Sequence, residues 1–571
     1  MLYLLLKFAY IILLSFLFGI ASDWILQKYT ARPDRPGSFA ITAINGLMII
    51  GMICSYFSLV APLAVTCNVL LGATGIGIAI LLRRHIKERW IQYHGQYKTA
   101  GGWAFLFFIL LTAYVLYLSA LQSINYDEGL YYAPFIKWIQ TYRVVPGLAN
   151  LHERFGFNSH WHLLAAVFNW SWLTGQSGNQ LNGVLYLLVS VYLLQIFRHP
   201  HIQWPHQLIM AGILLLINMP QTSVYFITAP SADLVIFYFG CLLFLCWSQQ
   251  EHISGDLRIF RILAPFFLVT VKVSSMPVLL LPAIATWQYL YTRSWTKAAA
   301  VCLTGIIILT PWIIRNVMLS GYLLFPLETI DICQVDWKSP AAEIIRNRSL
   351  VHDCAYVMNK DAAVLQAGAG LQKMYTWFFH NLRLYDKLLL MGFVLSPIVI
   401  VYHHRRLTRA QWESYSYLWI GMLFWLSQAP DPRFAYGYLV PGTVWAVALL
   451  VKTNKSFHFQ RGITVGCTLL FAVITLLLYN HLHRQFVSRG LVNMSANASI
   501  WLFPQPYSTP PLSKETTPFP YYKATEQCWD GPLPCTYRLP AGIRRRGATL
   551  QEGFKVITPP PKMGPKMAPA D

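Results

Sequence analysis

The sequence predicts an all-α protein that crosses a membrane many times, and three observations carry this prediction. Of the 571 residues, 56% are hydrophobic and only 12% are charged, which is about half the charged fraction of a soluble domain. The apolar residues form runs of roughly 20, the length that a helix needs to cross a bilayer. Lys and Arg gather in short loops between these runs, as is typical of the cytoplasmic loops of helical membrane proteins.

Each apolar run, taken as one span, gives about fourteen spans. The runs cover residues 2–22, 40–58, 62–82, 103–122, 181–197, 206–226, 231–247, 262–274, 276–291, 299–314, 388–403, 413–429, 435–451 and 462–479. The first run has no positively charged segment before it, so we interpret it as a retained span and not as a cleaved signal. The pair 262–274 and 276–291 is short and contains Lys272 and Pro277, which suits a broken hairpin as well as two full spans.

Basic loops set the predicted orientation. We place "RRHIKER" (83–89), "HHRRLTR" (403–409) and "KTNK" (452–455) in the cytoplasm. This choice puts both chain ends and the loop with Asp127 and Glu128 outside. The net charge of +21 is spread over such loops and forms no contiguous basic domain, so we expect no nucleic-acid partner.

These assignments divide the chain into three parts. Residues 1–100 form an N-terminal three-span segment with a basic cytoplasmic loop. Residues 101–480 form the transmembrane core, with external loops at 123–180 and 315–387. Residues 481–571 form a short external tail, with a small ordered unit and a Pro-rich, disordered end.

The cysteines agree with this orientation. Six of the ten lie within or at the edge of apolar runs. The other four, Cys333, Cys354, Cys528 and Cys535, fall on the predicted external side in two close pairs. An oxidising compartment would allow each pair to bridge, although the spacing leaves the connectivity open.

The stretch "INYDEGLYYAPFIKWIQTYRVVPGL" (124–148) begins where a membrane-length run ends. Asp127 and Glu128 there are suited to capping a following helix, because carboxylates accept its free N–H groups and face its positive dipole end. Capping does not explain why residues 129–142 are so aromatic, a composition that suits a helix at the lipid headgroup level. A carboxylate held at that level could act as a general base for a hydroxyl group.

The segment "HWHLLAAVFNWSWLTG" (160–175) is apolar but too short to span comfortably. We expect an interfacial or re-entrant helix on the external face, rich in Trp as such helices are. His160 and His162 form a His-x-His pair that could ligate a metal, but hydrogen-bonded histidines at the interface explain this spacing better.

Further charged residues lie on the predicted external side and could form an anion site. The candidate phosphate ligands are Arg154, Lys272, Arg315 and Arg433. Guanidinium groups match phosphate oxygens bidentately, and a lysine within apolar sequence needs a partner or a function. Asp233 and Asp431 stand near the external starts of two spans and are further site candidates, with helix capping as the alternative.

The order of these segments resembles the GT-C glycosyltransferases of the aminoarabinose-transferase and protein-mannosyltransferase type. This chain has the same order of segments as that family. It has a span, an acid pair with an aromatic helix ("DEGLYYAPFIKWI"), an interfacial segment ("HWHLLAAVFNWSWLTG") and a span with a basic turn ("LNGVLYLLVSVYLLQIFRHP"). The resemblance covers about 103–480. The chain also resembles bacterial polytopic membrane proteins with "PWIIRN…SGYLLFP" and "APDPRF". It departs in its three extra leading spans, in "NSHWH" where a Pro-Pro element is usual, and in its short tail.

The resemblance implies a bacterial inner-membrane enzyme that transfers a sugar from a polyprenyl phosphate to an envelope glycan, lipid or protein on the periplasmic face. The acid motif corresponds to Asp127 and Glu128, one of which would deprotonate the acceptor hydroxyl. Cationic side chains would stabilise the departing lipid phosphate. Some members of the family use a divalent cation bound by the acid and others do not, so the sequence leaves the metal and any cofactor open.

Three other roles stay open, and the simplest is a structural scaffold without activity. An O-antigen-type polymerase or ligase would use related chemistry with a lipid-linked acceptor. A transporter or flippase of lipid-linked glycans would bury charges at mid-membrane between symmetry-related, broken helices. Lys272 beside a broken hairpin favours transport, but the sequence shows no internal repeat.

Overall fold

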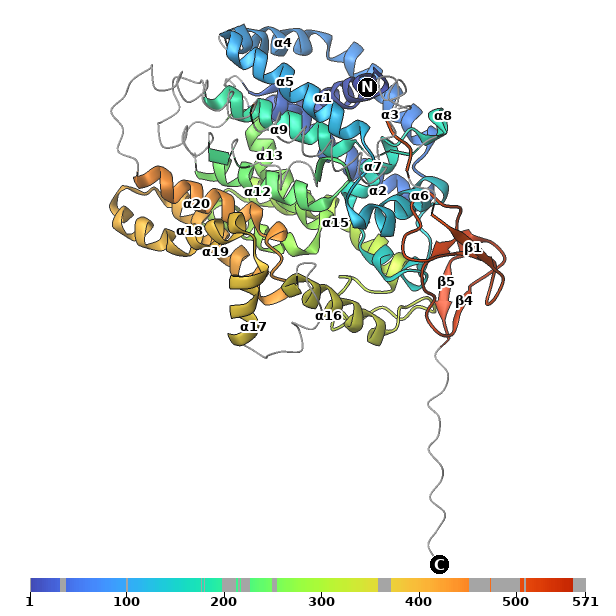
Figure 1. Ribbon diagram of the computed structural model, residues 1–571. Helices are drawn as coiled ribbons and strands as arrows, with labels where there is room; N and C mark the ends of the chain where they lie inside the picture. The colour runs from blue at the N-terminus through green and yellow to red at the C-terminus, as the bar shows by residue number, and fades with distance from the viewer. Residues whose placement is uncertain are drawn as a thin grey trace, which may run out of the picture.

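The computed structural model (Figure 1) describes residues 2–30, 37–98, 101–175, 177–178, 180–197, 212–213, 216, 226–248, 254–357, 371–450, 473, 504–507 and 510–557. Within these residues the chain is a helical bundle with a small β unit at one end. The predicted all-α class therefore describes the bundle, and the strands of the C-terminal unit are an addition to it.

The described residues contain the following helices, given in chain order. The first ten are α1 (Leu2–Thr30), α2 (Phe39–Val60), α3 (Val65–Leu81), α4 (Arg83–Lys98), α5 (Gly101–Ala120), α6 (Ala133–Thr141), α7 (His160–Val167), α8 (Ser171–Thr174), α9 (Leu181–Phe197) and α12 (Ala232–Ser248). The next are α13 (Gly255–Val271), α14 (Leu280–Tyr291), α15 (Trp295–Ser320), α16 (Ala341–Val357), α17 (Leu371–Thr376), α18 (Leu384–Tyr402), α19 (Arg409–Gln428) and α20 (Tyr436–Leu450). In the bundle, α2 packs on α1, α7 and α13, and α12 packs on α13 and α20.

Five helices of the described chain are long and apolar enough to cross a membrane, which makes this a membrane protein. They are Leu2–Lys28, Phe39–Val60, Val273–Tyr291, Trp295–Ser320 and Leu384–Tyr402. A sixth candidate is Val65–Leu81 with Arg83–Gly95, a pair bent by 83°. The expected fourteen spans are thus not supported.

Helix length explains much of this difference. α9 and α12 have 17 residues each and α20 has 15. At about 1.5 Å per residue these helices are shorter than the roughly 30 Å of a bilayer core. The predicted spans at 206–226 and 462–479 lie almost wholly outside the described residues.

Glycines bring the first two helices into close contact. A Cβ atom on Gly19 of α1 would lie 1.9 Å from the carbonyl oxygen of Thr42, and one on Gly46 of α2 would lie 1.7 Å from that of Ser15. Small residues at crossing points allow backbones in a membrane to approach closely. This contact fixes α2, whose far end carries Ser58, and the Ser58 carbonyl oxygen accepts the backbone N–H of Val144 at 2.9 Å.

The two ends of the bundle carry different charged groups. At one end, Arg89 of α4 pairs with Asp23 of α1 (2.8 Å), and the backbone N–H of Ser38 donates to Asp256 at the start of α13 (2.6 Å). Asp127 follows the C-terminal end of α5, and Lys272 follows that of α13, so the lengths of these two helices lie between the two groups of charges. The basic turn 83–89 and the acid pair therefore lie at opposite ends, as the predicted orientation requires.

Lys272 marks a break in the helical hairpin. α13 ends at Val271, and Lys272 is extended, with φ −159° and ψ 130°. A 3₁₀ turn, Val273–Leu279, then leads into α14. Of the two predicted forms for this pair, the broken hairpin is the one observed.

The segments expected at the lipid interface are mostly inside the protein. Tyr132, Phe135 and Trp138 are buried, and the Trp138 ring lies 6.0 Å from that of Phe554 in the C-terminal unit. Every residue of α7 is buried, against α2, α6 and α13. Three of the aromatic residues of 129–142 therefore serve packing within the protein, and the position of this helix at the lipid headgroup level stays a prediction. α7 is short, however, and does not span, as expected.

The C-terminal unit is built from two small sheets. β1 (Leu512–Glu515) pairs antiparallel with β2 (Tyr521–Ala524), which pairs parallel with β3 (Cys535–Thr536). β4 (Ile543–Arg545) pairs antiparallel with β5 (Phe554–Val556). Phe519 and Phe554 of this unit join the main hydrophobic core, so the unit is docked on the bundle.

One of the two expected disulfides is present. Cys528 and Cys535 are bonded, which confirms that pairing. Cys333 and Cys354 are free, so the other suggested pairing was wrong. Cys354 lies on the exposed side of α16, and Cys333 lies in the extended segment before that helix.

This difference predicts a labelling pattern. Iodoacetamide is expected to modify Cys354 in the native, unreduced protein, because its thiol is exposed and unbonded. Cys528 and Cys535 are expected to react only after reduction. Peptide mass mapping measures both, with Cys354→Ser as the control, and a Cys333–Cys354 cross-linked peptide would contradict the prediction.

Candidate functional site

Five charged side chains that are distant in sequence meet at the end of the bundle that carries the C-terminal unit. Arg433 Nε lies 2.9 Å from Asp431 Oδ2 and 3.9 Å from Asp233 Oδ2, and Arg433 Nη1 lies 3.8 Å from Asp127 Oδ2. Lys272 Nζ lies 2.5 Å from Asp233 Oδ1. These residues are called the charged cluster, and all five were site candidates from the sequence.

Local structure explains how each helix end contributes. Asp233 stands in the first turn of α12, where a carboxylate is favoured by the helix dipole. Asp431 caps the 3₁₀ turn Pro432–Phe434, since its Oδ1 accepts the backbone N–H of Arg433 at 3.1 Å. Capping therefore holds for Asp431, Asp233 faces the positive end of the α12 dipole, and both side chains also bind the cations of the cluster.

The break after α13 gives Lys272 its direction. Because the chain is extended at Lys272, its side chain leaves the helix axis and reaches Asp233. Its ammonium group also lies 3.5 Å from the centroid of the Phe434 ring, a cation–π contact. The intramembrane lysine of the sequence thus has a carboxylate partner.

The members of the charged cluster differ in accessibility. The Asp233 side chain is only 5% exposed, whereas those of Asp127 and Arg433 are 22% and 29% exposed. Asp233 is therefore an internal counter-ion, and Asp127 and Arg433 can meet a ligand. The backbone N–H of Asp127 donates to Asn125 Oδ1 at 3.0 Å, which fixes the turn that presents its carboxylate.

Two residues extend the charged cluster. Burial raises the pKa of Tyr131, the carboxylates of Asp127 and Asp233 raise it further, and Arg154 opposes them. The hydroxyl of Tyr131 therefore stays protonated and can donate a hydrogen bond. In the described chain no carboxylate lies within 4 Å of the Arg154 guanidinium, which lies over the Phe157 ring at 5.6 Å. Arg154 is a cation without a pairing acid, as a phosphate ligand should be.

The sequence analysis did not single out Tyr131 as a site residue. It was one of several aromatic residues following the acid pair, and nothing local separated it from Tyr132, which is buried. Tyr131 is recognised as a site residue only because Asp233 and Arg154, which belong to other segments, lie close to it in the folded chain.

The acid pair itself is divided. Asp127 faces Arg433, whereas Glu128 is 0% exposed and its Oε1 accepts a hydrogen bond from the Tyr507 hydroxyl. Side chains of adjacent residues in a helical turn point about 100° apart, so the two carboxylates lie in different environments. Glu128 is not presented to a ligand, and the prediction that either acid could act as the base narrows to Asp127.

Arg315 does not belong to the charged cluster, contrary to its prediction as a phosphate ligand. It is buried in α15, where Nε donates to Asn158 Oδ1 at 3.1 Å and Nη1 donates to Ser58 Oγ at 2.7 Å. These bonds join α15 to α2 and to the loop before α7. The predicted position outside a span that ends at 314 was wrong, because α15 continues to Ser320 and holds Arg315 inside the helix, where its partners are neutral.

His160 and His162 do not form a metal site. On a helix, side chains two positions apart point about 200° apart. The His160 ring faces Phe267 (6.1 Å), and the His162 ring faces Tyr132 (4.9 Å). In the described residues, no group of three or more His, Cys, Asp or Glu side chains is arranged to hold a metal ion.

Burial lowers the pKa of His160 and of His162 to about 3 each. Because these values lie below the unfolded value of about 6.5, the unfolded chain binds more protons below pH 6.5. Stability is therefore complete above about pH 6.5 and falls as the pH decreases toward 3. The melting temperature of wild type should drop more steeply between about pH 7 and about pH 4 than that of His162→Phe. His352→Phe, at a half-exposed position, serves as the control, and parallel curves for all three proteins would contradict this account.

A small cleft of about 20 Å³ lies where the loop at 149–153 meets the segment 339–346 and the C-terminal unit. Its charges balance, because Glu343 pairs with Arg346 at 2.6 Å and lies 3.9 Å from Arg538. Asn150 Oδ1 and Ser339 Oγ are buried there with no hydrogen-bond partner among the described residues. Such atoms can bind a polar ligand that enters the cleft.

Comparisons with known proteins give one match. The model of a family described as "Domain of unknown function (DUF8201)" matches residues 1–440. The match includes all five members of the charged cluster as well as Tyr131 and Arg154. No curated protein and no solved structure matches the chain significantly.

Proposed function

We propose, from the premise that this chain belongs to the DUF8201 family, that it is a membrane glycosyltransferase of the GT-C type. It transfers a sugar from a polyprenyl-phosphate donor to a hydroxyl-bearing acceptor of the cell envelope. The observation that carries the proposal is the charged cluster. In it the accessible carboxylate of Asp127 lies 3.8 Å from Arg433, and Arg433 and Lys272 both contact Asp233. Transfer from a phosphate needs such a base next to such cations.

In the proposed reaction, Asp127 accepts the proton of the acceptor hydroxyl as its oxygen attacks the anomeric carbon. The bond from that carbon to the phosphate oxygen breaks, and the phosphate leaves with the electron pair. Arg433 and Lys272, with Arg154 nearby, stabilise the added negative charge on the phosphate. The products are the glycoside, the polyprenyl phosphate and a protonated Asp127.

Asp127 suits the role of base better than its neighbours do. Asp233 is almost fully buried against Lys272, and Asp431 caps a turn while it pairs with Arg433 at 2.9 Å. Asp127 lies 3.8 Å from Arg433, farther than Asp431 does, and its side chain is 22% exposed. Asp127 therefore loses the least interaction energy when the Arg433 guanidinium turns to bind a phosphate.

The position of the charged cluster suits a lipid donor. The cluster lies at the ends of α12, α13 and α20, where the headgroup of a lipid beside the bundle would be found. By the distribution of basic turns, this end faces the periplasm of a bacterial inner membrane. A transporter would need its charges at mid-membrane, so the location at the helix ends favours transfer over transport.

The small cleft between the loop at 149–153 and the segment 339–346 is a candidate site for one hydroxyl group of the acceptor. Asn150 Oδ1 and Ser339 Oγ can bind hydroxyl groups, and the carboxylates of Glu153 and Glu343 can accept further hydrogen bonds. Glu153 directly precedes Arg154, so one loop would contact both substrates.

The experiment uses the full chain in proteoliposomes with a polyprenyl-phosphate-linked, radiolabelled hexose and a bacterial envelope fraction. We expect release of free polyprenyl phosphate and label in the acceptor, with no loss of label from the donor in liposomes that lack the protein. If the donor crosses the bilayer with its sugar–phosphate bond intact, the protein is a transporter and the proposal fails. Label found only on a second lipid-linked glycan would assign a polymerase or ligase.

A further inference from the structure

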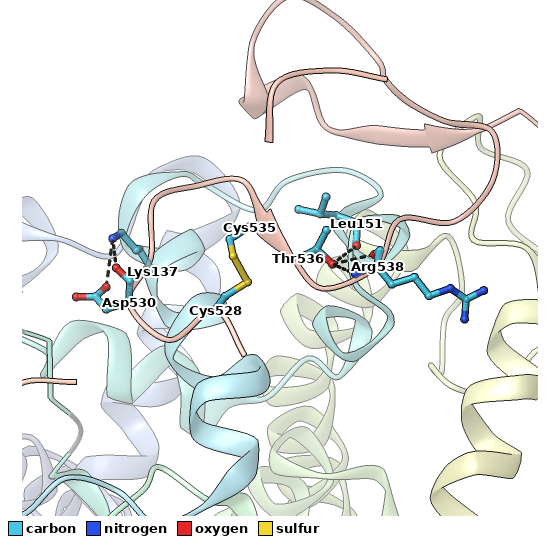
Figure 2. The surroundings of a disulfide bond; sticks show 7 residues. All are labelled: Lys137, Leu151, Cys528, Asp530, Cys535, Thr536 and Arg538. Atoms are coloured by element: carbon cyan, nitrogen blue, oxygen red, sulfur yellow. Dashed lines mark hydrogen bonds and ion pairs between the residues drawn. A yellow bond between two sulfur atoms is a disulfide. The ribbon is translucent and has the colours of Figure 1, made fainter. Parts of the chain in front are cut away.

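We infer that the disulfide-closed loop 526–535 of the C-terminal unit positions the general base, and that Trp529 is the positioning residue. This inference rests on the proposed role of Asp127. It assigns a function in catalysis to a part of the chain that lies beyond the family match, which ends at residue 440. Figure 2 shows the loop with its disulfide, between Lys137 on one side and Leu151 on the other.

Trp529 contacts the backbone of the acid motif directly. Its backbone N–H donates to the carbonyl oxygen of Gly129 at 2.9 Å. Its ring lies against Gly129 so closely that a Cβ atom there would be 2.3 Å from Cε2 of the indole. Gly129 stands two residues after Asp127, and only glycine leaves room for this contact.

The backbone of Trp529 has an uncommon conformation. Its φ is 46°, in the left-handed region that bulky side chains rarely adopt. Such a conformation costs free energy and persists where the surroundings require it, often at functional sites. Here it accompanies the hydrogen bond to Gly129.

The same loop also holds the residue before Asp127. Gln527 Nε2 donates to the carbonyl oxygen of Tyr126 at 2.6 Å, and the Tyr126 hydroxyl donates to Glu526 Oε2 at 3.2 Å. The backbone is therefore fixed on both sides of Asp127, at positions 126 and 129. The carboxylate that faces Arg433 has little freedom to turn away.

A third contact anchors the buried acid of the pair. The Tyr507 hydroxyl donates to Glu128, and the Tyr507 ring lies 5.5 Å from the Trp529 ring. Glu128 thus has a role distinct from the proton transfer, because it ties the acid motif to the residues that position it.

The loop is itself held at both ends. On one side Lys137 Nζ donates to the carbonyl oxygen of Asp530 at 2.8 Å, and on the other Thr536 Oγ1 donates to that of Leu151 at 3.2 Å (Figure 2). The Cys528–Cys535 bond joins the two sides. Because its anchors lie on the bundle, the loop can transmit their rigidity to Asp127.

The test compares Trp529→Ala and Trp529→Phe with wild type in full-length protein in proteoliposomes. Misplacing a reacting group by about 1 Å can cost a hundredfold in rate, so we expect Trp529→Ala to lower kcat about 10- to 100-fold with KM for the donor unchanged. Trp529→Phe keeps an aromatic ring on Gly129 and should recover most of the loss. Trp90→Ala, an exposed tryptophan of α4, is the matched control and should leave both constants unchanged.

A second measurement does not depend on activity. Amide hydrogen exchange of residues 124–132 should accelerate in Trp529→Ala, and in wild type after reduction of Cys528–Cys535, while exchange in α18 stays constant. Wild-type kcat together with wild-type exchange in Trp529→Ala would overturn the inference. A lower kcat accompanied by faster exchange throughout the bundle would also overturn it, because the effect would then be on the whole fold.

The two proposals can fail separately. If wild type transfers no sugar, the proposed function fails, and if Asp127→Asn keeps full transfer, the role of Asp127 as the base fails. In both cases the exchange measurement still decides whether the loop holds the acid motif. If Asp127→Asn is inactive but Trp529→Ala is fully active, the function stands and the positioning role is wrong.

Discussion

Replacing Asp127 by Asn is expected to reduce sugar transfer about a thousandfold, because the amide cannot accept the proton of the acceptor hydroxyl. The loss should appear in kcat, since the cations that bind the donor phosphate are unchanged. Asparagine keeps the size of the side chain and can still contact Arg433, so insertion and melting temperature should stay close to those of wild type. Release of polyprenyl phosphate under saturating donor measures the effect.

Glu128→Gln is the matched control, because it makes the same change from carboxylate to amide one residue further on. Glu128 is fully buried, and a glutamine oxygen can still accept the hydrogen bond of Tyr507, so we expect near-normal transfer. Full activity in Asp127→Asn with loss in Glu128→Gln would reverse the two roles. Transfer that persists in the double variant would show that neither acid is the base.

Replacing Lys272 by Met is expected to weaken both stability and donor binding. Asp233 is almost fully buried and would lose its closest cation, a change that costs about 2 kcal/mol where one partner is partly exposed to solvent. The donor phosphate would lose a positive charge, so KM for the donor should rise about tenfold. Chemical unfolding in detergent and the transfer assay measure the two effects.

The double variant Asp233→Asn, Lys272→Met separates the two roles of Lys272. Removing both charges leaves no unpaired buried carboxylate, so most of the lost stability should return. Donor KM should stay high, because the phosphate ligand is still missing. If KM also returned to the wild-type value, Lys272 would serve only to neutralise Asp233, and Arg433 with Arg154 would have to bind the phosphate alone.

Several features of the site could be predicted because local sequence determines them. Apolar runs and basic turns indicated the membrane helices and placed the acid pair and the basic turn 83–89 at opposite ends. A lysine and a proline within an apolar stretch indicated the break at Lys272. The number of spans was overestimated, because composition identifies apolar helices without showing how long each one is.

Other features depended on directions that sequence does not contain. Asp127 and Glu128 are neighbours, yet one faces a cation and the other a buried tyrosine, because a helical turn sends adjacent side chains different ways. Arg315 and Arg433 were both predicted outside the membrane spans, and only packing decides that Arg315 lies within α15 and turns inward to Asn158 and Ser58. Tyr131 acquired a role only through neighbours from other segments.

By itself, the sequence determined that this chain lies in a membrane and which end of its helices carries the acid pair. These properties follow from hydrophobicity, charge and spacing over short stretches. Only the tertiary structure decided that Asp127, Asp233, Lys272 and Arg433 meet, and that residues about 400 positions later fold back on the acid motif. Such contacts arise when whole helices pack, and the energy that selects one packing is spread over the entire core.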